Sequence, residues 1–150
     1  MNFYEITEQD KELIKTALKT LENNFDDGIY NHTVGAAIRC KNGKVYSGVN
    51  CDGIHGSCAE YITIGMAISA GERKFDTIVA VHDKAPNCLV APCGNCRQML
   101  VEYCPDIKVI LNNDLSVNLG YVATYIPSIA RTNTIISGIT NWLLSNISKP

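Results

Sequence analysis

The sequence has no run of lysine or arginine residues along its 150 positions. Its 13 basic residues are balanced by 15 acidic ones, which gives a formal net charge of −2 at pH 7. A protein that binds a nucleic-acid backbone normally presents a stripe of positive charge that neutralises phosphates. The sequence therefore argues against nucleic acid as a partner.

Long apolar runs are also missing. A transmembrane helix needs about 18 or more consecutive apolar residues, and no stretch of the chain approaches that length. The first 19 residues alternate charged and apolar side chains and do not form the apolar centre of a signal peptide. We therefore expect a cytoplasmic protein that has no membrane partner.

Cysteine, by contrast, is well represented. The chain has seven cysteines, an odd number, and two of them form a Cys-x-x-Cys pair. Without an export signal, this pattern favours metal binding or free thiols in a reducing compartment over a disulfide framework. With 46% apolar and 19% charged residues, the chain can bury a core without disulfide bonds.

The periodicity of apolar residues predicts alternating helices and strands. Helices are expected over residues 8–24, 58–70 and 93–103, with a short one at 122–126. Strands are expected over residues 34–40, 45–50, 77–82 and 107–111, the first two joined by an Asn-Gly turn. Strands that are connected through helices should be parallel, and the hairpin pair antiparallel. This order predicts an α/β fold in which helices cover a mixed sheet.

The chain has no internal repeat and no obvious linker before residue 130. We expect residues 1–130 to form one catalytic domain. Apolar residues at helical spacing over 131–150 predict an amphipathic helical extension of the same domain, which could dock on a partner subunit.

Two short segments predict a single metal site. Residues 57–60 read Ser-Cys-Ala-Glu, and residues 92–97 read Pro-Cys-Gly-Asn-Cys-Arg. Each segment opens a predicted helix, whose N-terminus carries partial positive charge that stabilises a thiolate. Cys93 and Cys96 are three residues apart and share one helix face. Cys58 can reach them if the strands that feed the two helices lie side by side.

The ligand types favour zinc, because thiolates are soft ligands. Three thiolates leave one position of a tetrahedral zinc ion free, which is typical of a catalytic site. Glu60 points elsewhere on its turn and should lie beside that position, where it can take a proton from water and deliver it to a substrate. Three thiolates overcompensate the charge of Zn²⁺, and Arg97 is the cation best placed to hydrogen-bond one of them.

Simpler interpretations stay open for the same residues. Ser57 and Glu60 also fit an ordinary capping box. The Cys-x-x-Cys pair could be the redox pair of a thiol–disulfide exchanger. A structural zinc site closed by a fourth cysteine is a further alternative because Cys88 and Cys104 flank the pair, although Cys104 should lie about three helical turns from Cys93.

At these residues the chain resembles the cytidine deaminase family, and within it the blasticidin S deaminases more than typical nucleoside enzymes. The resemblance covers about residues 8–130, and its most specific parts are the two cysteine motifs. It implies a three-layer α/β/α sandwich with a central mixed five-stranded sheet. It also implies one Zn²⁺ per chain on Cys58, Cys93 and Cys96, catalysis by Glu60, and a homotetramer with active sites close to subunit interfaces.

The resemblance further implies which residues bind substrate. Asn50 matches an asparagine that holds the sugar in nucleoside deaminases, and Asp52 stands where a glutamate is expected. His32 stands where a nucleoside enzyme often stacks a phenylalanine, and Ala59 precedes the catalytic residue. Tyr61 stands where many three-cysteine nucleoside deaminases carry an arginine, which leaves more of the charge compensation to the arginine after the second motif.

The implied reaction is zinc-dependent hydrolytic deamination of the 4-amino group of a cytosine nucleoside, cytidine or deoxycytidine, with release of ammonia. The alternative substrate is blasticidin S or another compound that resembles a cytosine nucleoside. The loop over residues 51–57, which includes His55, is shorter than in nucleoside enzymes and should decide between these substrates. A nucleic-acid-editing deaminase would need basic and aromatic residues along a groove, which the acidic balance disfavours.

Overall fold

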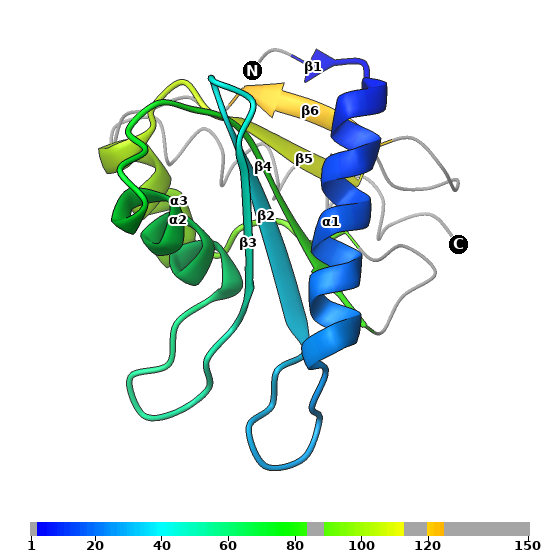
Figure 1. Ribbon diagram of the computed structural model, residues 1–150, viewed down its shortest axis with the longest axis vertical. Coiled ribbons are helices and arrows are strands. Elements are labelled where there is room, and N and C mark those ends of the chain that lie inside the picture. The colour runs from blue at the N-terminus through cyan, green and yellow to red at the C-terminus, as the bar shows by residue number, and fades with distance from the viewer. Residues whose placement is uncertain (1–2, 84–88, 113–119, 125–150) are drawn as a thin grey trace, which may run out of the picture.

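A mixed six-stranded sheet with helices on both faces forms the described part of the chain, residues 3–83, 89–112 and 120–124 of a computed structural model (Figure 1). The helices are α1 (Glu8–Asn24), α2 (Ala59–Ser69) and α3 (Gly94–Tyr103). The strands are β1 (Phe3–Tyr4), β2 (Val34–Cys40), β3 (Val45–Val49), β4 (Phe75–His82), β5 (Lys108–Asn112) and β6 (Gly120–Thr124). Helix α1 lies on one face of the sheet, and α2 and α3 lie side by side on the other. The expected three-layer sandwich is confirmed.

The strand order is β1-β6-β5-β4-β2-β3. Strands β4 and β5, which are connected through α3, are parallel, and the β2–β3 hairpin is antiparallel, as the connections predict. The sheet has six strands instead of the implied five because Phe3–Tyr4 forms a short edge strand that pairs with β6. The hairpin turns at Gly43, whose φ of 88° lies in the left-handed region that glycine adopts readily.

One sequence prediction about the sheet is wrong, and one condition set for the metal site is not met. Residues 122–124, part of the expected helix over 122–126, belong to strand β6, which pairs antiparallel with β5. A short apolar run cannot be assigned by periodicity alone, and here a non-local pairing partner decides its structure. The strands that feed α2 and α3 are also not neighbours, because β2 lies between β3 and β4. Helix α2 reaches α3 by packing across β2 and β3.

Alternating residues of the central strands build two separate core layers. One layer packs under α1, and the other packs under α2 and α3. Gly35 in β2 permits the closest approach of α1, because a Cβ atom there would lie 2.7 Å from the Ala17 carbonyl oxygen. The fully buried members of the α1 layer include Leu13, Ala17, Ala37 and Val79, and those of the opposite layer include Ile38, Ile78, Met99 and Leu100.

Helix α1 begins at a capping box formed by Thr7 and Asp10. The Thr7 side chain accepts a hydrogen bond from the Asp10 amide, and the Asp10 carboxylate accepts one from the Thr7 amide at 3.0 Å. Within the described residues, no helix is long and apolar enough to cross a membrane. The amphipathic helix expected over 131–150 lies outside the described residues, and the division of the domain at residue 130 stays a prediction.

A charged network ties α1 to the sheet at the end opposite the cysteine motifs. The Arg39 guanidinium in β2 donates hydrogen bonds to Asp10 at 2.8 Å and to Asp76 at 2.7 and 2.9 Å. Burial acts to raise the pKa of both carboxyl groups, but hydrogen bonds from Thr7, Thr77 and Arg39 outweigh it and lower both pKa values. The network therefore stabilises the fold at neutral pH, and this contribution is lost as the pH falls through the lowered folded-state pKa values.

Replacing Arg39 with methionine should lower the free energy of unfolding at pH 7 by about 3 kcal/mol, because Asp10, whose side chain is only 5% exposed, would lose its cation. Urea titration followed by circular dichroism measures this loss. Lys11→Met removes an exposed ion pair with Glu8 and should leave the unfolding midpoint nearly unchanged. A loss below about 1 kcal/mol for Arg39→Met would show that the network does not carry this stability.

Candidate metal centre and active site

The two helices place their cysteines at their first turns. Cys58 is the N-cap residue of α2, Cys93 is the N-cap residue of α3, and Cys96 follows in the first turn of α3. The capping-box interpretation of Ser57 is wrong, because the N-cap is one residue later and makes no side-chain capping hydrogen bond. The Cys93 sulfur, in contrast, accepts a hydrogen bond from the Cys96 amide at 3.5 Å. The helix starts therefore present sulfur atoms to the space between them.

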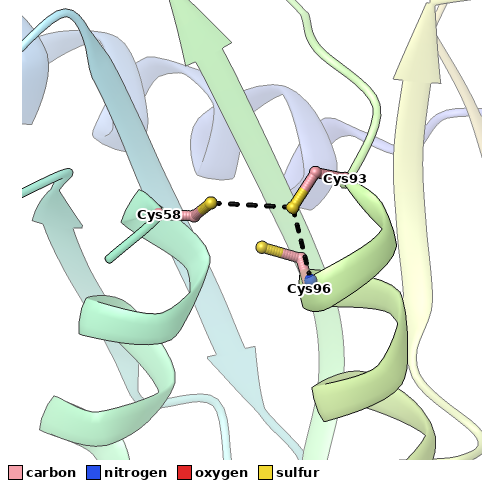
Figure 2. Close-up of side chains that lie close together, drawn as sticks. All are labelled: Cys58, Cys93 and Cys96. Carbon is pink, nitrogen blue, oxygen red and sulfur yellow. Dashed lines mark hydrogen bonds between the residues drawn. The ribbon is translucent and has the colours of Figure 1, made fainter. Parts of the chain in front are cut away.

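The three sulfur atoms converge although the two motifs lie far apart in the sequence. Figure 2 shows the side chains of Cys58, Cys93 and Cys96 pointing toward one another from α2 and α3. The Sγ atoms of Cys58 and Cys93 are 3.6 Å apart, and all three sulfur atoms lie within 4.8 Å of one another. The structure thus brings together the three predicted ligands.

The donor set and its spacing fit a zinc ion. Two sulfur ligands of one tetrahedral zinc are about 3.8 Å apart when each zinc–sulfur bond is about 2.3 Å. The 3.6 Å separation of Cys58 and Cys93 is close to this value. The three residues would hold the ion through their thiolates.

The pKa directions of the three thiols bear on how they would bind a metal ion as thiolates. Burial and a hydrogen bond with Cys93 raise the pKa of Cys58. Burial also acts to raise the pKa of Cys93, but hydrogen bonds from the Cys96 and Asn95 amides and with the other two thiols together outweigh it and lower that pKa. Burial, together with the charges of Glu60 and Cys58, strongly raises the pKa of Cys96. Three thiolates at this spacing need a cation to offset their charge, and their deprotonation would accompany metal binding.

A fourth protein sulfur does not join this group among the described residues. Cys104 lies at the C-terminal end of α3, away from the three sulfur atoms at the helix starts, and burial raises its pKa to about 12. Cys88, the other cysteine considered for a closed site, lies outside the described residues. The described part of the centre is therefore a three-sulfur site, which leaves one tetrahedral position for a non-protein ligand.

Glu60 lies beside the sulfur atoms and is almost fully buried, with 5% of its surface exposed. Burial raises the pKa of its carboxyl group, although a hydrogen bond with Cys96 acts to lower it. A carboxyl group with a raised pKa exchanges protons more readily near neutral pH than an exposed glutamate does. The position and pKa direction of Glu60 suit the predicted proton transfer.

A cavity of about 510 Å³ opens beside the cysteines. This volume lies within the range of small-molecule sites. The cavity is lined by both motifs and by the β3–α2 loop, including Asn50, Asp52, Cys58, Ala59, Glu60 and Cys93. Among the described residues that line it, neither His32 nor His55 occurs.

Asn50 already uses its side chain to join two chain segments. Its Oδ1 atom accepts hydrogen bonds from the amides of Thr33 and Val34 at 3.0 and 2.9 Å, and its Nδ2 atom donates to the Asn31 carbonyl at 2.8 Å. His32 Nδ1 lies 2.6 Å from the Asn50 carbonyl oxygen. A sugar contact by Asn50, which lines the cavity, and a substrate contact by His32 stay predictions.

Asp52 is held by a residue that sequence reasoning missed. Its carboxylate accepts a hydrogen bond from Asn31 Nδ2 at 2.8 Å and one from the Gly53 amide at 2.9 Å. The Asn31 hydrogen bond is the main cause of the lowered pKa of Asp52. Asn31 has a φ of 53°, a left-handed conformation that asparagine tolerates better than most residues. Nothing in the local sequence indicates its contact with a residue 21 positions away.

Arg97 holds the backbone that leads into the second motif. Its Nη1 atom donates a hydrogen bond to the Pro92 carbonyl oxygen at 2.9 Å. Its Nε atom is buried and has no hydrogen-bond partner among the described residues. The predicted hydrogen bond from Arg97 to a thiolate stays a prediction.

Comparison with known families agrees with this geometry. The sequence model described as "Cytidine and deoxycytidylate deaminase zinc-binding region" matches residues 7–112, which include both cysteine motifs. The chain belongs to the cytidine and deoxycytidylate deaminase family. The match identifies the protein as a zinc-dependent hydrolase of the cytidine deaminase type and supports zinc as the ion for the three cysteines.

Individual members of the family resemble most of the chain. It is 39% identical to a blasticidin-S deaminase of Bacillus cereus over 120 residues, which cover 74% of this chain and 84% of that protein. It is 40% identical to a cytidine deaminase of Halalkalibacterium halodurans over 106 residues, 67% of this chain and 77% of that protein. A crystal structure of a Burkholderia pseudomallei cytidine deaminase matches the fold with a TM-score of 0.60 at 30% identity, covering 79% of this chain and 93% of that one.

Proposed function

We propose that this enzyme hydrolyses the 4-amino group of a cytosine ring carried by a nucleoside or a nucleoside-like compound. The observation that carries the proposal is the buried Glu60 carboxyl beside three convergent sulfur atoms at the edge of a cavity. Similarity to both a cytidine deaminase and a blasticidin-S deaminase supports a cytosine ring as the shared part of the substrate.

The three cysteines and Glu60 would have separate roles in the reaction. Cys58, Cys93 and Cys96 hold the metal, and a zinc ion held there supplies Lewis-acid activation of water near neutral pH. Glu60 accepts a proton from the attacking water and passes it to the departing amino nitrogen. A carbon–oxygen bond forms at C4 of the ring, the carbon–nitrogen bond breaks, and ammonia leaves.

Asp52 would influence whether a cytosine nucleoside that binds in the cavity can carry a 5′-phosphate. Its carboxylate lines the cavity, and hydrogen bonds from Asn31 and the Gly53 amide hold its pKa low, so it is negatively charged at neutral pH. A 5′-phosphate brought near this carboxylate would be repelled. The substrate class that the cavity supports is therefore a nucleoside or nucleoside-like compound and not its phosphate ester.

Loss of the cytosine absorbance tests this function on protein of measured zinc content. The panel consists of cytidine, deoxycytidine, blasticidin S and deoxycytidine 5′-phosphate. We expect turnover of at least one of the first three, with kcat/KM at least about tenfold above that of the phosphate. Preferred turnover of the phosphate, or no turnover of any compound by zinc-loaded protein, would contradict the proposal.

The panel also separates the two candidate substrates. Cytidine is supported by the family and by the cytidine deaminases among its relatives. Blasticidin S is supported by the 39% identity to the Bacillus cereus enzyme over 84% of its length. The homotetramer implied by the family resemblance and the cytoplasmic location expected from the sequence belong to the same proposal, and size-exclusion chromatography with light scattering tests the oligomeric state.

A further inference from the structure

A tyrosine hydroxyl bridges the two helix starts that carry the cysteines. Tyr61 lies in the first turn of α2, three residues after Cys58, and Asn95 lies between the two cysteines of α3. The Tyr61 hydroxyl donates to Asn95 Oδ1 at 3.2 Å and lies 3.5 Å from the Asn95 carbonyl oxygen. Cys58 and Glu60 at the start of α2 also share hydrogen bonds with Cys93 and Cys96 of α3, so the Tyr61 contact is a further connection that involves no predicted metal ligand.

Packing of the Tyr61 ring fixes the position of its hydroxyl group. The residue is half-buried, and it packs against the core layer under α2 and α3. Because the ring is held by this layer, the hydroxyl reaches α3 without ordering a free side chain, which lowers the entropic cost of the contact. Asn95 itself is exposed, so its contribution to the apolar core is small.

The Tyr61–Asn95 hydrogen bond restrains the separation of the first turns of α2 and α3. A metal site whose ligands come from both helices depends on this separation. Cys93 and Cys96 belong to the same helix turn, so their relative positions are fixed locally. Cys58 comes from the other helix, and its sulfur is correctly placed only when the two helix starts keep their separation. A hydrogen bond between residues adjacent to the ligands on both helices restrains this separation directly.

We propose that Tyr61 and Asn95 are positioning residues that hold the starts of α2 and α3 at the separation required for three-sulfur zinc binding. The inference rests on the metal-dependent function proposed for the same site. The hydrogen bond pre-organises the ligands, so that less conformational freedom is lost when the ion binds. Its removal should weaken zinc retention without removing any ligand.

The test measures zinc release from the purified zinc-loaded protein to a chromogenic chelator in excess. Tyr61→Phe keeps the ring and removes only the hydroxyl, and it should release zinc about three- to tenfold faster than the unmodified protein. Asn95→Ala should have an effect of the same size. The double variant should release zinc no faster than the more affected single variant, because both substitutions break one interaction.

Tyr103→Phe is the matched control, because it removes a hydroxyl from an exposed tyrosine at the far end of α3. It should release zinc at the unmodified rate. Release from Tyr61→Phe at the unmodified rate, or additive effects of the two single substitutions, would overturn the inference.

The outcome also separates this inference from the proposed function. Zinc-loaded protein that deaminates a cytosine compound, combined with unchanged release from Tyr61→Phe, overturns the positioning role alone. Unmodified protein that does not bind zinc overturns both.

Discussion

Replacing Glu60 with glutamine should lower kcat by about 10³-fold while the protein keeps one zinc ion per chain. Glutamine has nearly the same shape but cannot accept and return a proton. The side chain is not one of the three sulfur ligands, so metal content should be unaffected. Turnover of the preferred substrate and zinc content by atomic absorption, measured on the same preparation, separate the two effects.

Glu102→Gln supplies the matched control for this experiment. Glu102 lies on the exposed side of α3, where it accepts a hydrogen bond from Gln98 at 2.8 Å. The same chemical change there should leave kcat within about twofold of the unmodified enzyme, as is usual for surface substitutions. If zinc-loaded Glu60→Gln turned over substrate within about tenfold of the unmodified enzyme, Glu60 could not be the proton shuttle.

Replacing Cys96 with alanine should remove both the metal and the activity. Its side chain is completely buried and its sulfur is one of three that converge between the helices, so no solvent-exposed group can take its place. Two thiolates bind zinc far more weakly than three, and we expect the zinc content to fall below about one tenth of an ion per chain. Turnover should fall in proportion to the bound metal.

Cys104→Ala is the control for loss of a buried cysteine from the same helix. Cys104 is 6% exposed, and burial keeps its thiol protonated, with a pKa of about 12. This variant should lose some stability, about 1 kcal/mol, and retain one zinc ion per chain. Full zinc retention by Cys96→Ala, in protein that circular dichroism shows to be folded, would exclude Cys96 as a ligand.

Local sequence signals predicted much of the fold. The Asn-Gly pair predicted the turn of the β2–β3 hairpin, the Thr7–Asp10 capping box lies at the start of α1, and Gly71, with a φ of 92°, follows the end of α2. Each of these features depends on residues that lie close together in the sequence, and a short sequence window therefore contains the information needed to predict it. Strand β6 was misread because its structure depends on pairing with β5, which no short window of sequence contains.

The residues of the candidate site likewise fall into those that the local sequence predicts and those whose contacts depend on the fold. Cys58, Cys93 and Cys96 could be grouped from residue type and from their places at helix starts, although the strands that lead into the two helices are not neighbours. The contacts around them could not be found in this way. The Asn31–Asp52 and Tyr61–Asn95 hydrogen bonds join residues 21 and 34 positions apart, and they form only because the fold brings these polar side chains together.

X-ray absorption spectroscopy at the zinc edge of the purified protein, with its metal content determined in parallel, shows how many sulfur atoms hold the ion. We expect one zinc ion per chain with three sulfur ligands and one lighter atom, oxygen or nitrogen. Four sulfur ligands would make the centre a closed structural site and would contradict the account, as would a folded protein that binds no zinc.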